Sequence, residues 1–230
     1  MEVEEIKRKM SSIMYQKRST HVDKFPYLVQ WDLSQYTDID TDHSYFTPYA
    51  EILNRVKLFS KPDMVEVGIS KGGGLLFWKE LLEPKLLCGI DIEYNIHGHV
   101  GNLLFDSEPS SIVTIIDDAY TKRTVERLKV LFPNGIDIVS EDGLHTIDTQ
   151  IKFVELYHPL VKKGGVMIIE DIFHPDWLPP AHWVPGNDVS LISRSDVLVE
   201  YLEGKMYDFE LYDVREVKNR VDDIVVAIYV

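Results

Sequence analysis

Acidic side chains and one histidine occur at two places late in the chain, and their chemistry suits a divalent metal ion. Asp142 and His145 are three residues apart, and Glu170 and Asp171 follow the apolar run 166–169. The ends of neighbouring parallel strands lie about 5 Å apart, so carboxylates there can share one cation. Oxygen ligands favour Mg²⁺, with Mn²⁺ as the alternative. We therefore expect Asp142, Glu170 and Asp171 to be metal ligands.

His145 has the chemistry of a general base. Imidazole titrates near neutral pH, and a metal ion lowers the pKa of a hydroxyl group that it binds. His145 could accept a proton from such a hydroxyl, or it could be a residue at the start of a helix with no chemical role. Its position three residues after Asp142 favours the catalytic interpretation.

A glycine-rich segment earlier in the chain suits a nucleoside cofactor. Gly68 and Gly72 allow a tight turn next to a ligand, and the following helix offers free N–H groups. Ser70 replaces the middle glycine of the dinucleotide pattern, and Glu66 places a negative charge where a pyrophosphate would be repelled. A carboxylate there suits a cofactor with a cationic amino group. The alternative is a flexible turn that binds nothing.

Three further acids follow the next two predicted strands. Asp91 closes the run 86–92, where an acid can accept hydrogen bonds from both hydroxyls of a ribose. Asp117 and Asp118 follow the run 112–116, which is a usual place for contacts to an adenine amine. We expect all three to bind the cofactor, although acids are also common in turns and on surfaces.

These residues require a fold that brings strand ends together, and the hydrophobic pattern predicts one. Short apolar runs alternate with helical periodicity, which is typical of a doubly wound parallel sheet with crossover helices. Such sheets bind ligands beyond the carboxyl ends of their strands. The predicted fold is α/β and Rossmann-like, with a seven-stranded sheet of five parallel strands and a C-terminal antiparallel hairpin. The predicted strands are 64–68, 86–92, 112–116, 136–140, 166–169, 209–214 and 224–230, and the predicted helices are 45–59, 75–82, 122–131, 146–160 and 195–202.

Two segments fall outside this alternation. Residues 1–40 are polar with scattered aromatic side chains, and we expect an arm, lying against the domain or a partner subunit, that adds no core element and could support a homo-oligomer. Residues 41–230 would then form the domain. In the loop 172–190, Trp177 and Trp183 are placed either to stack on a sugar or aromatic ring or to anchor the loop. Lys162–Gly165 is predicted to be a turn.

The composition bears on the number of domains, the class of partner and the cellular compartment. A chain of 230 residues with 45% hydrophobic residues predicts a single domain. The net charge of −14 disfavours a nucleic-acid partner, which needs basic side chains to displace counterions. The single cysteine, Cys88, excludes an intrachain disulfide. No apolar stretch approaches the roughly 20 residues of a membrane span. We expect a cytoplasmic protein without a membrane partner.

Three segments resemble one enzyme family. They are Glu66-Val67-Gly68 with Gly72-Gly73, the run 141–145 (EDGLH), and the run 164–171, which ends in Glu170-Asp171. They are similar to the macrolide-sugar O-methyltransferases of the mycinamicin and tylosin pathways, and to the related rhamnosyl O-methyltransferases and cephalosporin-hydroxylase-like proteins. The resemblance covers roughly residues 40 to 175. It implies S-adenosylmethionine and Mg²⁺ as cofactors, and as acceptor a deoxysugar such as rhamnose in a glycan or natural product.

The resemblance also implies roles for individual residues. Asp142, Glu170 and Asp171 would be the metal ligands and His145 the base that deprotonates a sugar hydroxyl. The segment 42–45 resembles the family's element before the first helix, which would place Tyr45 near the cofactor.

Three other functions remain open from the sequence. A catechol-type O-methyltransferase would use a similar strand-end metal site for a phenolic acceptor. A non-catalytic nucleoside-binding subunit would leave the acids solvated. An NAD-dependent oxidoreductase is disfavoured by Glu66 and Ser70 and lacks an evident Tyr-Lys pair.

Overall fold

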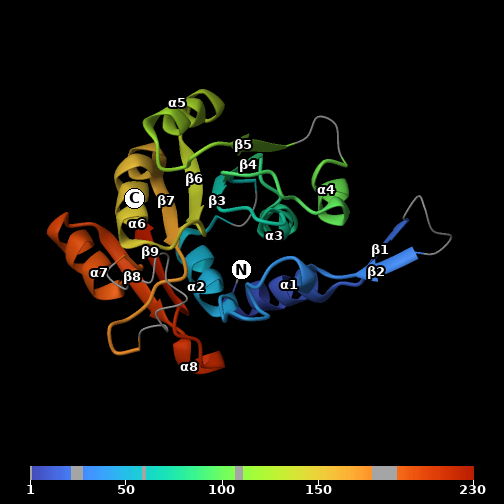
Figure 1. Cartoon of the computed structure of the whole chain (residues 1–230), viewed down its shortest axis with the longest axis horizontal. Coiled ribbons are helices and arrows are strands. Elements are labelled where there is room, and N and C mark those ends of the chain that lie inside the picture. The colour runs from blue at the N-terminus through green and yellow to red at the C-terminus, as the bar shows by residue number, and fades with distance from the viewer. Residues whose placement is uncertain (1, 22–27, 59–60, 107–110, 178–190) are drawn as a thin grey trace.

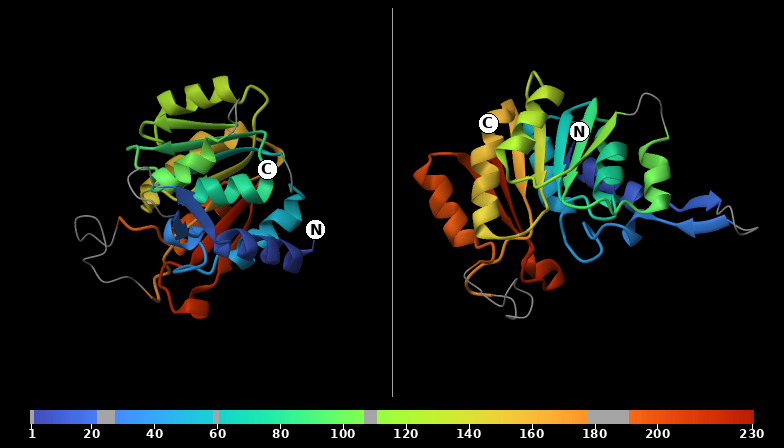
Figure 2. Two further views of the ribbon diagram at one scale, coloured as in Figure 1. Left: turned by 90° about the vertical axis from the view of Figure 1, so that its right-hand side faces the viewer. Right: turned by 45° about the horizontal axis from the view of Figure 1, so that its top comes forward.

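A computed structural model describes residues 2–21, 28–58, 61–106, 111–177 and 191–230. A twisted sheet forms the centre of the molecule, and helices cover both of its faces (Figures 1 and 2). The strands of this sheet are β3 (Asp63–Val67), β4 (Leu86–Asp91), β5 (Ile112–Ile116), β6 (Ile136–Glu141), β7 (Val161–Ile169), β8 (Asp208–Asp213) and β9 (Ile224–Tyr229).

The strand order is β5-β4-β3-β6-β7-β9-β8, which confirms the predicted Rossmann-like sheet. The five strands from β5 to β7 are parallel, and β9 pairs antiparallel with both β7 and β8. Val67 pairs with Glu141, and Glu141 pairs with Ile169, so β3, β6 and β7 end side by side. The residues that follow these three strands therefore meet at one edge of the sheet. This is the place, between β3 and β6, where successive strands stop being added on one side of β3 and continue on the other.

Alternate residues of each strand point to opposite faces, and each face has its own core. Met64 of β3 belongs to one hydrophobic cluster, and its neighbour Val65 belongs to the other. The first cluster packs under α1 (Val3–Tyr15), α2 (Phe46–Val56), α3 (Gly73–Leu82) and α4 (Gly98–Leu104), and the second under α5 (Lys122–Leu131), α6 (Ile147–Tyr157) and α7 (Ser195–Gly204). The short elements are η1 (Leu33–Gln35), η2 (His158–Leu160) and α8 (Arg215–Lys218).

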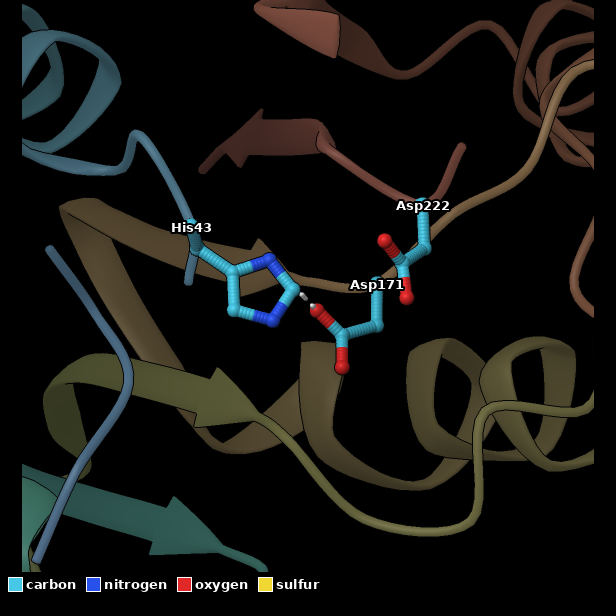
Figure 3. A group of neighbouring side chains, drawn as sticks. All are labelled: His43, Asp171 and Asp222. Carbon is cyan, nitrogen blue, oxygen red and sulfur yellow. Dashed lines mark ion pairs between the residues drawn. The ribbon is translucent and has the colours of Figure 1, made fainter. Parts of the chain in front are cut away.

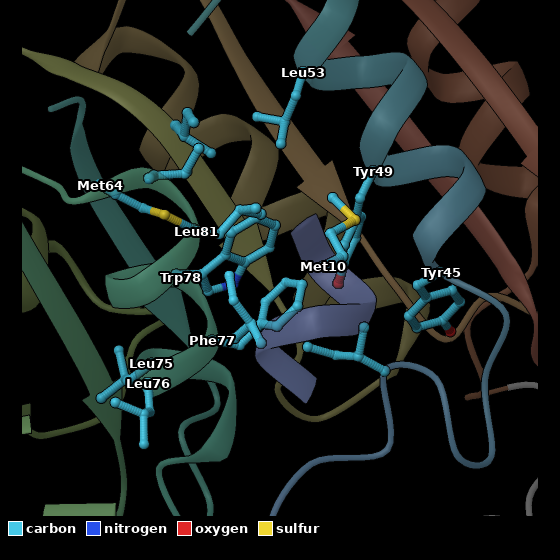
Figure 4. Close-up of a cluster of buried hydrophobic side chains, with 14 of the residues drawn as sticks. Met10, Tyr45, Tyr49, Leu53, Met64, Leu75, Leu76, Phe77, Trp78 and Leu81 are labelled. Atoms are coloured by element: carbon cyan, nitrogen blue, oxygen red, sulfur yellow. The ribbon is translucent and has the colours of Figure 1, made fainter. Parts of the chain in front are cut away.

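The N-terminal segment corrects one prediction. We expected residues 1–40 to add no core element, but Ile6, Met10 and Met14 of α1 are fully buried against α2 and α3. Figure 4 draws Met10 among the side chains of these two helices. The apolar residues of α1 recur at helical spacing, which shows that the amphipathic pattern was present in the sequence. Beyond α1, the hairpin of β1 (Arg18–His21) and β2 (Leu28–Trp31) extends away from the sheet (Figures 1 and 2).

A second prediction is wrong at the start of β7. Lys162–Gly165 is not a turn before the strand but an irregular part of it, because the pairing with β6 shifts from Ile136–Val161 to Ile138–Val166. Gly164 adopts a φ of 84°, which a residue with a side chain rarely accepts. Across the described ranges, no helix combines the length and apolar character needed to cross a membrane.

Candidate active site

A cavity of about 900 Å³ opens at the shared edge of β3, β4, β6 and β7. Its volume suits a nucleoside cofactor together with part of a second substrate. The predicted site residues that line it are Glu66, Gly68, Ser70, Asp91, Asp117, Asp118, Asp142, His145, Glu170 and Asp171. The cavity wall also contains a segment that sequence reasoning missed, residues 34–39 with Thr41 and Asp42. That segment has no periodic hydrophobic pattern, so it gave no signal of a structural role.

Glu66 lines the cavity and has one carboxylate oxygen that is buried and unpaired within the described ranges. Its side chain is buried, and Oε2 has no hydrogen-bond partner among the described residues. Burial and the charge of Glu170 raise the pKa of Glu66 well above its usual range, although a hydrogen bond from Trp78 opposes this. Leaving a buried charged group unpaired is costly, so the site favours a cationic ligand group that would pair with Glu66.

The glycine-rich turn is held by Asp91. Its Oδ2 accepts hydrogen bonds from the backbone N–H groups of Ile69 and Ser70, both at 3.0 Å. Gly68 has a φ of 83°, and a side chain at this position would overlap the backbone carbonyl oxygen of Asp142. Asp91 thus shapes the turn next to the cavity, and its binding of a ribose stays a prediction.

Of the other predicted cofactor residues, Asp117 and Asp118 line the cavity and Gly72 does not. Asp117 is ion-paired with Arg123, and this contact lowers its pKa. Asp118 accepts a hydrogen bond from the backbone N–H of Tyr120 at 2.8 Å, which fixes the turn after β5. Gly72 does not line the cavity, and a Cβ at this position would meet the side chain of Ile96 in the segment that leads to α4. Its binding of the cofactor stays a prediction.

Asp142, His145 and Asp171 form what we call the cavity group. Their ligand atoms all lie within 4.8 Å of one another. His145 Nε2 lies 3.8 Å from Asp142 Oδ1 and 3.4 Å from Asp171 Oδ2. No lysine or arginine in the described ranges lies within ion-pair distance of either carboxylate.

The pKa of Asp142 is shifted, and no lysine or arginine of the described ranges pairs with its carboxylate to offset the shift. The Asp142 side chain is 40% exposed and lines the cavity. Burial and the charges of Glu170 and Asp171 raise the pKa of Asp142 well above its usual range. Such an arrangement disfavours ionised carboxylates unless a cation joins them, so the donor set fits a hard divalent ion.

Two members of the cavity group have an uncommon backbone conformation. His145 and Asp171 both have positive φ values, 51° and 55°, which are uncommon for residues with side chains. His145 directly precedes Thr146, whose hydroxyl caps α6 in a capping box. Strain of this kind is maintained only where the surrounding structure holds it, and it is concentrated at functional sites.

Glu170 lies in the cavity wall but is turned away from the cavity group. Its Oε1 accepts a hydrogen bond from Ser140 Oγ at 2.7 Å, and Tyr49 is a second side-chain partner. Burial raises the pKa of Glu170 to about 7, against the effect of these hydrogen bonds. Its carboxylate belongs to neither set of residues placed to share a metal ion. Its role as a metal ligand therefore stays a prediction, because in this orientation its carboxylate is not grouped with the other ligand atoms.

Tyr45 contacts Asp171 from outside the cavity wall. It is buried and does not line the cavity. Its hydroxyl donates a hydrogen bond to Asp171 Oδ1 at 2.5 Å and accepts one from the Asp171 N–H at 3.2 Å. Tyr45 therefore orients Asp171, and its binding of the cofactor stays a prediction.

A second set of residues, which we call the ion-paired group, reaches Asp171 from its other side. It consists of His43, Arg220, Asp222 and Asp223. His43 Nδ1 lies 2.7 Å from Asp223 Oδ1 and 3.5 Å from Asp171 Oδ1. Figure 3 shows His43, Asp171 and Asp222 facing one another from separate parts of the chain.

The ion-paired group also has the spacing of a metal site, since His43, Asp171 and Asp222 have ligand atoms within 4.8 Å. Its charges are already balanced, however. Arg220 contacts both oxygens of Asp222, at 2.9 and 3.0 Å. No pattern in the sequence predicted this group, because His43 and Asp223 are 180 residues apart.

Of the two tryptophans predicted to stack or to anchor the loop after β7, the structure describes only Trp177. Trp177 does not line the cavity, and the Arg215 guanidinium lies 5.9 Å from the centre of its ring. This contact fits the anchoring alternative for Trp177. Trp183 and the rest of 178–190 lie outside the described residues.

Comparison with known proteins identifies the domain. Residues 65–172 match the family model described as a methyltransferase domain. The chain is 26% identical over 140 residues to demethylmacrocin O-methyltransferase of Streptomyces fradiae, covering 58% of this chain and 33% of that protein. It is 30% identical over 144 residues to an uncharacterized protein of Acanthamoeba polyphaga mimivirus, covering 55% and 59% of the two chains. The chain thus spans less than two thirds of either relative.

Solved structures share the fold at lower sequence identity. The MycE methyltransferase of the mycinamycin biosynthetic pathway, in complex with Mg, SAH and mycinamycin VI, superposes with a TM-score of 0.59. It is 23% identical, and the match covers 85% of this chain and 52% of that one. A putative rRNA methylase from Clostridium thermocellum has a TM-score of 0.54 at 16% identity, covering 79% and 94%. The family match and the curated O-methyltransferase confirm the prediction of a class I methyltransferase domain for residues 65–172, and the solved structures share its fold.

Proposed function

We propose that this class I methyltransferase transfers a methyl group from S-adenosylmethionine to a sugar hydroxyl, with Mg²⁺ bound by the carboxylates of the cavity group. One observation carries the proposal. The same cavity is lined by Glu66, a buried carboxylate with one unpaired oxygen, and by the cavity group, a set of metal-ligand atoms in which Asp142 has no lysine or arginine of the described ranges within ion-pair distance. The first suits the cationic end of the cofactor and the second suits a divalent ion.

The cofactor would lie along the ends of β3 and β4. Glu66 would pair with its amino group, and the turn held by Asp91 would bring the backbone of residues 68–72 close to it. Asp118 lines the cavity after β5 and would contact the base of the nucleoside. S-adenosylmethionine supplies a methyl group on a sulfonium that is reactive without further activation. The chain's share is therefore to position the two substrates and exclude water.

The cavity group would prepare the acceptor. Asp142 and Asp171 would hold Mg²⁺ through their carboxylates, and Glu170 is retained as a proposed third ligand because it lines the same cavity. A bound divalent ion lowers the pKa of a hydroxyl group. His145 would accept the hydroxyl proton at Nε2, the ring nitrogen that faces the two carboxylates.

A polar wall supports a hydroxylated acceptor. Residues 34–42 contribute hydroxyl, amide and carboxylate side chains to the cavity, among them Gln35, Thr37 and Thr41. The curated relative is named as an O-methyltransferase of demethylmacrocin, and a MycE structure contains mycinamycin VI. By similarity we propose a sugar within a glycan or natural product, such as rhamnose, as the acceptor.

Calorimetric titration with S-adenosylhomocysteine, with NAD⁺ as the comparison ligand, tests the cofactor first. Binding of the first and none of the second is expected. An acceptor screen with S-adenosylmethionine would then compare rhamnosides with catechols, in Mg²⁺ and in EDTA, with product detected by mass spectrometry. Methylation of catechols alone would replace the sugar proposal with the phenolic alternative. Binding of neither cofactor would overturn the proposed function.

A further inference from the structure

Two side chains outside the cavity group, the buried Glu141 and the partly buried Tyr120, contact the loop that carries Asp142 and His145. Glu141 is the last residue of β6 and is fully buried. Its Oε1 accepts hydrogen bonds from the Tyr120 hydroxyl and from the backbone N–H of Gly143, the latter at 3.3 Å. The Tyr120 oxygen in turn accepts a hydrogen bond from the N–H of Leu144 at 3.2 Å.

These contacts hold the two residues that separate Asp142 from His145. Gly143 and Leu144 belong to no helix or strand, so their N–H groups have no partner from regular secondary structure. The pair formed by Tyr120 and Glu141 supplies both partners from beneath the loop. Each hydrogen bond fixes one peptide unit, and together they fix the direction in which the loop leaves β6.

The fit between the pair and the loop is close. A Cβ atom on Gly143 would overlap the Tyr120 hydroxyl, and it would lie 3.1 Å from Glu141 Oε1 and 3.3 Å from Val67 Cγ1. The loop therefore lies directly on the pair, with no space for a side chain or a water molecule at that point. A change in the pair must move the loop.

We propose that Tyr120 and Glu141 are positioning residues that hold the 142–145 loop in its metal-binding conformation. Asp142 and His145 stand at the two ends of the held segment, and they meet at Asp171 because the segment between them is fixed. The inference rests on the proposed function, since it assigns the pair a task for the same ion. Residues that orient metal ligands typically change metal affinity by about 10–100-fold when they are altered.

The test compares Tyr120→Phe with Tyr157→Phe. Each variant removes one tyrosine hydroxyl, from the partly buried Tyr120 or from the fully buried Tyr157. The Tyr157 hydroxyl donates to the Ala119 carbonyl oxygen at 2.9 Å and does not contact the loop. Calorimetric titration with Mn²⁺ should show about tenfold or greater weakening in Tyr120→Phe and wild-type affinity in Tyr157→Phe, with S-adenosylhomocysteine binding retained in both. Equal Mn²⁺ affinity in the two variants would overturn the proposal.

A double-mutant cycle separates positioning from simple destabilisation. Gly143→Ala should weaken Mn²⁺ binding strongly in the wild type, and less in the Tyr120→Phe background, where the overlapping hydroxyl is gone. Additive effects would contradict the pair's role. If the variants do not fold, hydrogen exchange of the wild-type Gly143 and Leu144 amides decides the question, since slow exchange is expected and rapid exchange contradicts it. Absence of Mn²⁺ binding by the wild type would instead overturn the metal site itself, and the positioning role with it.

Discussion

Asp171 belongs to two groups that have similar geometry and opposite electrostatics. On one side, Oδ2 faces His145 in the cavity group, and on the other side Oδ1 faces His43 in the ion-paired group. Both groups combine a histidine with carboxylates at metal-binding spacing. Only the ion-paired group contains its own counter-charge, in Arg220. Ligand spacing alone therefore does not distinguish a metal site from a structural ion-pair network, whereas charge compensation does.

The pKa shifts express the same difference. Burial opposes protonation of His43, but its hydrogen bonds to Asp223 and Asp38 and the charge of Asp171 raise its pKa to about 10. The charged form of His43 is therefore favoured, as an ion pair requires. In the cavity group the raised pKa of Asp142 means that its charged form is disfavoured until a cation arrives. One group is complete within the chain, and the other requires a ligand.

The largest effect is expected from Asp142→Asn, which removes a charge from the cavity group. Mg²⁺-dependent turnover should fall by more than about 100-fold, because loss of a ligand should exceed the effect of altering its supporting partners. The metal-free variant should be as stable as the wild type or more stable, since one repelling charge is gone. Activity assays with and without EDTA and thermal unfolding measure the two effects. Unchanged turnover would remove Asp142 from the metal site.

His145→Asn tests the base separately from the metal. Asparagine tolerates the positive φ at this position better than alanine does, so the loop should keep its shape. The kcat should fall by about 10²–10⁴-fold, the usual contribution of a general base. S-adenosylhomocysteine affinity, measured by calorimetry, should not change. A wild-type kcat would assign His145 to loop structure only.

Asp223→Asn breaks the ion-paired group and should affect stability. Asp223 is fully buried, and removing its charge leaves buried His43 without its closest partner. Breaking a buried pair typically costs about 3–5 kcal/mol of unfolding free energy. Urea denaturation of the metal-free protein measures this loss. If Mn²⁺ affinity fell while stability did not, the two groups would have been assigned the wrong roles.

The smallest effect is expected from Arg220→Gln. The Arg220 side chain is 32% exposed, so solvent screening limits its pair with Asp222 to about 0.5–1 kcal/mol. A stability loss equal to that of Asp223→Asn would contradict this ranking. Binding of an additional divalent ion by the variant would sharpen the comparison between the two groups. It would show that Arg220, by pairing with Asp222, prevents a metal ion from binding at the ion-paired group.

The sequence predicted strand ends well and side-chain directions poorly. Asp142, Glu170 and Asp171 were placed correctly at one edge of the sheet, because apolar runs mark buried parallel strands and their carboxyl ends must coincide. The same pattern carries no information about rotamers. Glu170 turns toward Ser140 for a hydrogen bond that depends on the pairing of two strands.

Contacts between distant parts of the chain were also beyond prediction. His43 meets Asp223 because the segment before α2 and the turn before β9 pack together, and no local pattern in either segment indicates the other. The role of α1 is different, since its amphipathic pattern could be recognised but was outweighed by the polar composition of residues 1–40. Periodicity was the better guide there.

The contact between Gly68 and the Asp142 carbonyl has a consequence for how such an enzyme could acquire new acceptors. The cofactor turn and the acidic loop touch through their backbones at this point, so a substitution on one side is felt by the other. Variation for substrate range would be tolerated better in the side chains of residues 34–42 that line the cavity, because they take no part in this backbone contact. Directed-evolution libraries should therefore diversify that wall and leave position 68 as glycine.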